Sequence, residues 1–170
     1  RLSALDDETE ALLRVAAVTG AQFDIAVVGA VAGLVEDRVV GGLDVACDRQ
    51  LVVEDPDRFG WYRFAHALVR QTLLEELSTT RRIRLHQAIG EQIEHRSPDR
   101  VEEIAYHYLE AAAAGSAAQA VEWAQRAGDL AAERLALEQA VNWYERALEA
   151  EETLPPDPVR RCELLLALGR

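Results

Sequence analysis

The stretch that decides the fold of the first half of the chain is LVVEDPDRFGWYRFAH, residues 51–66. It begins with a short β-branched run, passes through a turn rich in Asp, Pro and Gly, and ends on an aromatic segment. Two such runs joined by turn residues predict a β-hairpin. Because successive side chains of a strand point to opposite faces, we expect Tyr62 and Phe64 to share one face of the hairpin. Trp61 and Arg63 then share the other.

Three helices are predicted upstream of the hairpin. They cover about residues 3–19, 24–33 and 36–48, with acidic residues at their starts and a glycine after each of the first two. Two glycines at 41–42 lower the helix propensity of the third by about 1 kcal/mol each. Three short helices followed by a hairpin is the order of elements in a winged helix. Residues 1–66 are therefore predicted to form a winged-helix domain.

Connecting helices are predicted for residues 67–97. The first begins at His66, and the next is capped by Ser78 or Thr79. The second helix carries the basic cluster of the chain, which consists of Arg81, Arg82, Arg84 and His86. We interpret this cluster as a solvated helix face rather than a nucleic-acid patch, because no aromatic residues are interleaved with it.

Ala-rich helices that recur about every twenty residues fill the rest of the chain, residues 98–170. Gly128 is followed twelve positions later by Ala140, and then by Tyr144. This spacing resembles a tetratricopeptide repeat, in which small residues let two helices cross closely and an aromatic side chain fills the gap. The expected fold class is therefore mainly α, a winged-helix domain followed by an α-helical tetratricopeptide-like solenoid. We expect the solenoid to be truncated at its C-terminal end.

Composition limits the function. The 170 residues carry a net charge of −12 and contain neither Lys nor Met. A chain without Lys cannot supply a phosphate-binding or Schiff-base lysine, and an acidic surface repels nucleic-acid phosphates. No apolar run is long enough to predict a membrane span. Cys47 and Cys162 are expected to be buried free thiols of a reducing compartment, and we expect a cytoplasmic fragment of a larger protein.

No motif of an enzyme is present. The chain lacks the nucleophile elbow, the phosphate-binding loop and the zinc-protease signature. Glu103 and His107 lie four positions apart and could share a metal, but neighbours on one helix face are the more common explanation of that spacing. We therefore predict no catalytic residue, no metal and no enzymatic activity for this chain.

The most specific segment is YRFAHALVR, residues 62–70, followed by Leu73, Leu74 and Leu77. It resembles the end of the winged-helix region in the signal-transduction ATPases with numerous domains. The resemblance is closest to large ATP-binding transcriptional regulators of the LuxR type and to similar modules linked to bacterial nucleotide cyclases. In these proteins an ATPase core is followed by a winged helix and then by helical repeats. The resemblance implies that ADP or ATP binds to the ATPase domain of a parent protein, with no cofactor in this fragment.

The same resemblance implies a role for His66. In related plant and animal immune ATPases, a Met-His-Asp motif begins a helix of the winged-helix domain, and its histidine contacts the β-phosphate of ADP. Here the motif reads Ala65-His66-Ala67, so only the histidine is retained. His66 would sense the nucleotide phosphate together with the ATPase domain. The alternative is a structural histidine that bonds a neighbouring carbonyl at a strand-to-helix junction.

The leading functional hypothesis is a non-enzymatic regulatory segment used in signal transduction or transcription regulation. Its winged helix would clamp the nucleotide domain of the same protein, and its repeats would bind a partner protein or a small-molecule effector. One alternative is a DNA-binding winged helix, but residues 36–49 hold four acids against two arginines, which is poor phosphate chemistry. Another alternative is a tetratricopeptide adaptor for protein–protein interaction.

Overall fold

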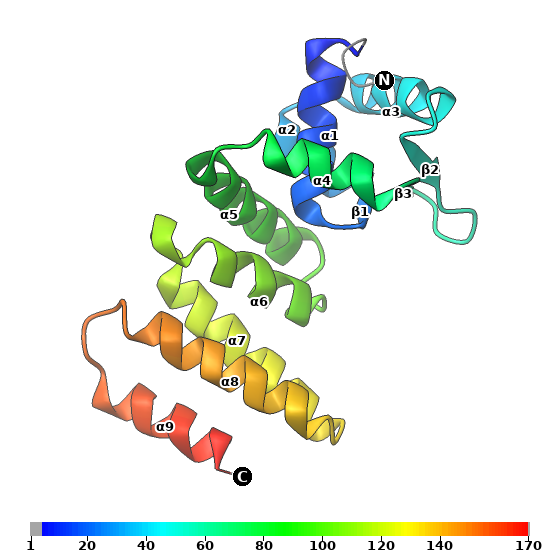
Figure 1. Ribbon diagram of the computed structural model, residues 1–170. Coiled ribbons are helices and arrows are strands. Elements are labelled where there is room, and N and C mark those ends of the chain that lie inside the picture. The colour runs from blue at the N-terminus through cyan, green and yellow to red at the C-terminus, as the bar shows by residue number, and fades with distance from the viewer. Residues whose placement is uncertain (1–4, 170) are drawn as a thin grey trace. The chain divides into compact units, whose positions relative to one another are not determined.

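The computed structural model describes residues 5–169, which are mainly helical with one small antiparallel sheet (Figure 1). The chain divides into two compact units, Arg1–Gln92 and Ile93–Arg170. The segment predicted to connect two domains, residues 67–97, therefore belongs mostly to the first unit. No helix in the described part of the chain is long and apolar enough to cross a membrane.

The first unit contains helices and strands in alternation. Its elements are α1 (Asp7–Thr19), β1 (Gln22–Asp24), α2 (Ile25–Ala32), α3 (Glu36–Asp48), β2 (Val52–Glu54), β3 (Trp61–Phe64), α4 (Ala67–Glu75) and most of α5 (Thr79–Arg96). The predicted extents of the second and third helices are confirmed. The first was predicted from Ser3, which lies outside the described residues, and begins at Asp7.

Capping explains where α1 and α2 begin and where α2 ends. The Asp6 carboxylate accepts the Thr9 backbone N–H at 2.8 Å, and the Asp24 carboxylate accepts the Ala26 N–H at 2.9 Å. Both bonds satisfy backbone donors that the first helical turn leaves without partners. Gly33 ends α2 in the left-handed conformation, with φ at 69°, which glycine adopts without a steric penalty.

The predicted hairpin is present, but it is part of a three-stranded sheet in the order β1-β3-β2. Tyr62 and Phe64 are buried and Arg63 is exposed, so the predicted alternation of faces is confirmed. Strand β1 was not predicted. It pairs antiparallel with β3, opposing Phe23 to Tyr62. The Phe23 ring is fully buried, with its centroid 6.1 Å from that of Tyr62 and 5.5 Å from that of Phe64.

The second unit is a series of helices. After the last residues of α5 come α6 (Val101–Glu110), the short 3₁₀ helix η2 (Ala112–Ala114), α7 (Ala117–Glu133), α8 (Leu137–Glu151) and α9 (Pro158–Leu168). Helix α7 packs against both α6 and α8 (Figure 1). Because Ala124, Ala127 and Ala131 are buried along α7, its neighbours can approach its backbone closely.

Contacts at its first turn and its last turn fix α9. The Asp157 carboxylate accepts the backbone N–H groups of Val159 and Arg160, both at 3.1 Å. The Arg161 guanidinium donates to the buried Glu151 carboxylate of α8 at 2.8 Å. At the other end of α9, two apolar residues pack against a cluster of Ala131, Ala140 and Tyr144. Both cysteines are free, but the expectation that both are buried is wrong, because Cys162 on α9 is exposed.

Candidate functional site

His66 is the residue that immediately precedes α4. Its backbone is extended, with φ at −140° and ψ at 135°, and its carbonyl oxygen accepts the Val69 N–H at 3.1 Å. The imidazole is exposed and does not cap the helix. Within the described residues it donates to no neighbouring carbonyl, which is the bond that a structural role at this junction would use.

The protein holds the start of α4 firmly on both sides of His66. The Ala65 N–H donates to the Leu51 carbonyl at 3.0 Å, which extends the β2–β3 pairing up to the helix. One turn into the helix, the Arg70 Nε donates to the Ala17 carbonyl of α1 at 2.9 Å. An exposed side chain on a fixed backbone can contact a partner without a large loss of backbone entropy on binding.

The basic cluster of α5 is smaller than its sequence indicates. Arg81, Arg82 and Arg84 are exposed, as a solvated helix face requires. His86 is buried, however, and its pKa is lowered to about 4 by burial and by the charges of Arg82 and Arg70. His86 is therefore neutral near pH 7 and adds no positive charge to the surface, which corrects its inclusion in the cluster.

Glu103 and His107, the two residues that the sequence offered as a metal pair, lie in different surroundings. The Glu103 carboxylate accepts two hydrogen bonds from the Arg100 guanidinium, at 2.8 and 2.7 Å. His107 is fully buried. In residues 5–169 no group of three His, Cys, Asp or Glu side chains is arranged to hold a metal ion.

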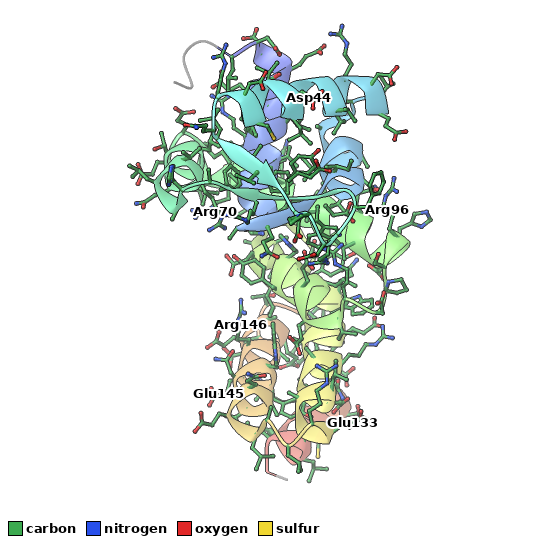
Figure 2. The ribbon with its side chains drawn as sticks, turned by 90° about the vertical axis from the view of Figure 1, so that its right-hand side faces the viewer. Asp44, Arg70, Arg96, Glu133, Glu145 and Arg146 are labelled. Carbon is green, nitrogen blue, oxygen red and sulfur yellow. The ribbon has the colours of Figure 1, made fainter. Side chains whose placement is uncertain are left out.

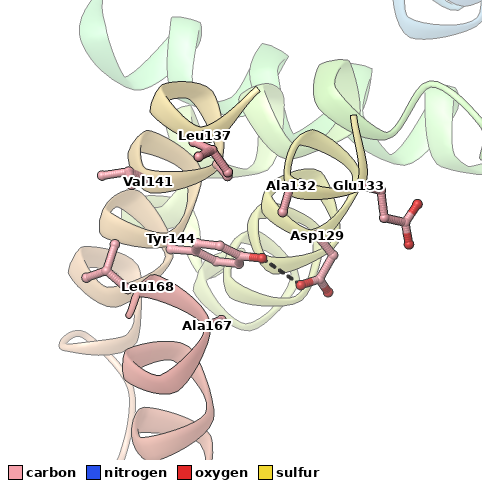
Figure 3. Close-up of a pocket in the computed structure, with 9 residues that line it drawn as sticks. Asp129, Ala132, Glu133, Leu137, Val141, Tyr144, Ala167 and Leu168 are labelled. Atoms are coloured by element: carbon pink, nitrogen blue, oxygen red, sulfur yellow. Dashed lines mark hydrogen bonds between the residues drawn. The ribbon is translucent and has the colours of Figure 1, made fainter. Parts of the chain in front are cut away.

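A groove of about 570 Å³ lies between α7, α8 and α9 in the second unit (Figure 3). Helix α7 contributes acidic side chains to it, and α8 and α9 contribute apolar ones. The lining residues are Asp129, Ala132, Glu133, Leu137, Ala140, Val141, Tyr144, Ala167 and Leu168. A concave surface with both apolar and charged walls suits an amphipathic ligand.

Tyr144 lines the groove and orders one of its acidic groups. Its ring is buried, and its hydroxyl donates to the Asp129 carboxylate at 2.7 Å (Figure 3). Glu133, one turn further along α7, is exposed (Figure 2) and forms no ion pair with the described residues. On the opposite wall, Leu137 and Val141 expose 60% and 39% of their surface.

Sequence reasoning did not find this groove. Leu137 and Val141 belong to an apolar series on α8, which predicts burial in the helix pair. The series does not reveal which of its members the neighbouring helices leave uncovered. The exposure of Leu137 and Val141 depends on the packing of the folded chain around α8.

Comparison of the chain with protein-family models, with curated proteins and with solved structures finds no match. Any functional assignment therefore rests on the arrangement of the chain's own residues.

Proposed function

We propose that the chain is a non-enzymatic regulatory region of a multidomain ATP-dependent signalling protein or transcriptional regulator in the cytoplasm. In this proposal the first unit is a winged helix that clamps a nucleotide-binding domain of the same protein. The second unit is a tetratricopeptide-like array that binds a partner protein or effector. ADP and ATP bind the nucleotide domain and not this chain alone.

The element order of the first unit supports the winged-helix assignment. Three helices are interleaved with a short strand, β1, and are followed by the hairpin of β2 and β3. Strand β1 pairs with β3, so the hairpin is anchored to the helices by a third strand. A second anchor lies at the hairpin turn, where the Ile25 N–H donates to the Gly60 carbonyl at 2.9 Å.

The observation that carries the proposal is the placement of His66. Its imidazole is exposed at the start of α4. The adjoining Ala65 N–H donates to the carbonyl of Leu51, just before β2, and the Arg70 side chain of α4 donates to the Ala17 carbonyl of α1. The first N–H groups of a helix attract anions, and an imidazole beside them can donate to the same phosphate. An exposed donor at that position is available to a nucleotide held by a second domain.

Charge disfavours DNA binding by this unit. On α3, which corresponds to the recognition helix of a winged helix, Asp37 and Asp48 are exposed. Asp44 on the same helix is exposed as well (Figure 2). In the hairpin, Glu54 at the end of β2 and Asp57 in the turn are exposed as well. Carboxylates at both positions would repel the phosphate backbone, which supplies most of the affinity of DNA-binding proteins.

The second unit supports the partner-binding half of the proposal. Gly128 and Tyr144 bring α7 and α8 into close contact, as the tetratricopeptide resemblance implies, and the groove beside them is open to a ligand. If the first unit has no clamping role, an adaptor for protein–protein interaction is the function that this groove favours.

Nucleotide titration of the protein in which this region accompanies its ATPase domain tests the clamp. We expect His66→Ala to weaken ADP binding by about 10- to 100-fold, the loss of one hydrogen bond to a charged group, and to leave ATP binding unchanged. His95→Ala, which removes another exposed histidine, is the matched control. Equal effects on both nucleotides, or no effect on either, would contradict the clamp.

A further inference from the structure

We propose that the groove between α7, α8 and α9 binds a cationic amphipathic helix of a partner protein. This inference rests on the proposed function in one respect only, the assignment of the second unit to partner binding. It adds the chemistry of the partner, which the proposed function leaves open.

The charge of the groove selects a cationic ligand. Its lining holds two carboxylates, Asp129 and Glu133, and the described lining residues include no arginine or histidine. Glu133 forms no ion pair with any of the described residues. Unlike charges across an interface favour association, and like charges exclude the wrong partner.

One of these carboxylates is already ordered. Asp129 accepts the Tyr144 hydroxyl at 2.7 Å, and the Tyr144 ring lies against Gly128 and cannot approach it further. The Asp129 side chain therefore loses little rotamer freedom when a cation binds to its carboxylate. Such preorganisation raises affinity by lowering the entropy lost on binding.

The spacing of the side chains along each wall of the groove favours a helical ligand. Asp129 and Glu133 lie four positions apart on α7, and Leu137 and Val141 lie four positions apart on α8. Residues at that spacing are neighbours on a helix surface, about 5–6 Å apart. A helix in the groove can present cations at the same interval to α7 and apolar side chains at the same interval to α8, as in other helix-in-groove complexes.

The same charges exclude other classes of macromolecule. Nucleic acids and anionic membranes present negative charge to a groove that is itself negative, so electrostatic attraction cannot bring them to it. A small organic cation with an apolar tail shares the chemistry of the proposed helix, but it would occupy only part of the two walls. The test must therefore separate a helix from a small amphiphile.

Two synthetic peptides and octylamine are the probes, titrated into the whole chain by calorimetry. The first peptide has leucines along one helical face and lysines at four-residue intervals beside them, and the second carries glutamates in place of the lysines. Of the two peptides, we expect only the lysine peptide to bind, and we expect its affinity to fall at higher salt. Octylamine should bind with lower affinity than this peptide. Binding by neither peptide, or by both equally, would overturn the proposal, as would octylamine binding as tightly as the peptide.

Substitutions inside and outside the groove test whether the lysine peptide binds there. Glu133→Gln should lower the affinity for the lysine peptide by about two- to fivefold, as expected for the loss of an exposed ion pair. Leu137→Ser should lower this affinity by about fivefold or more. Glu145→Gln is the matched control, because Glu145 is exposed on α8 but does not line the groove (Figure 2). All three residues are exposed, so the fold should tolerate these changes. If Glu133→Gln behaves like Glu145→Gln, the groove is not the binding site.

The failure of this inference is distinguishable from failure of the clamp. The nucleotide titration with His66→Ala tests the proposed role of the first unit, whereas the peptide titration tests that of the second. Selective loss of ADP affinity without peptide binding would remove only the groove assignment. Peptide binding with unchanged nucleotide affinities would remove only the clamp.

Discussion

Gly128 of α7 lies directly against the ring of Tyr144 of α8. A Cβ atom placed on Gly128 would stand 2.5 Å from Cε1 of that ring and 2.8 Å from its Cδ1 and Cζ. Carbon atoms in contact normally lie about 3.5–4.0 Å apart, so a methyl group does not fit unless the ring moves. The ring has little room to do so, because it is buried and its hydroxyl is bonded to Asp129. The close crossing of α7 and α8 depends on this pair.

We expect Gly128→Ala to lower the free energy of unfolding by about 1–3 kcal/mol, the usual effect of an overfilled core. Alanine favours a helix by about 1 kcal/mol over glycine, but the steric conflict outweighs that gain. Urea unfolding followed by circular dichroism measures the change. In the double variant Gly128→Ala/Tyr144→Leu the conflict is relieved, so the two substitutions should be non-additive. Strict additivity would show that the ring is not what excludes the methyl group.

Local signals in the sequence were sufficient for several parts of the fold. The interval from Gly128 to Tyr144 predicted the close helix crossing, because a missing side chain and a large ring must be opposed for two helices to approach. Asp24 and Gly33 predicted the limits of α2, because a carboxylate cap and a left-handed glycine act on adjacent backbone groups. The alternation at 61–64 predicted which residues of β3 are buried.

Features that depend on distant neighbours could not be predicted in this way. Strand β1 has three residues, too few to show an alternating pattern, and its partner β3 lies much further along the chain. His86 follows three arginines in sequence, but burial beside Arg70 of α4 determines its charge. Leu137 and Val141 belong to the apolar series of α8, yet the folded chain leaves them 60% and 39% exposed. In each case the deciding contact is with an element elsewhere in the sequence.

The burial of Phe23 gives a test of the unpredicted strand. Because its ring is fully buried against Tyr62 and Phe64, Phe23→Ala should lower the free energy of unfolding by about 3–5 kcal/mol. Phe59→Ala is the same substitution at a side chain that is 99% exposed, and it should change stability by less than about 0.5 kcal/mol. Chemical unfolding of both variants measures the difference. Similar effects at the two positions would mean that Phe23 of β1 is not packed against Tyr62 and Phe64 as described.

Two adjacent glycines of α3 should respond differently to the same change. A Cβ atom on Gly41 would meet no atom within 4 Å, whereas one on Gly42 would lie 3.1 Å from the Thr9 Oγ1 and 3.4 Å from the Leu12 Cδ2 of α1. Gly41→Ala should therefore stabilise the protein by about 0.5–1 kcal/mol, through helix propensity alone. Gly42→Ala should be less stable than Gly41→Ala, since α1 must move. Thermal unfolding measures the stability of the two variants. If Gly42→Ala is the more stable of the two, α1 and α3 are not in close contact at Gly42.

The buried His86 should make stability depend on pH. Its pKa is about 4 in the folded protein, compared with 6.5 for an exposed histidine, because of burial and the charges of Arg82 and Arg70. Between those two values the unfolded chain binds a proton at this side chain and the folded chain does not. The free energy of unfolding therefore falls as the pH decreases from about 6.5 to about 4. The whole change amounts to about 3 kcal/mol, of which about 2 kcal/mol is lost by pH 5.

Urea unfolding of the wild type and of His86→Gln at about pH 7.5 and pH 5 isolates this contribution. Other groups titrate equally in both proteins, so the difference between the two pH dependences belongs to His86. His95→Gln, at an exposed position of the same helix, should keep the pH dependence of the wild type. If His86→Gln retains that dependence as well, the pKa of His86 is not lowered in the folded protein.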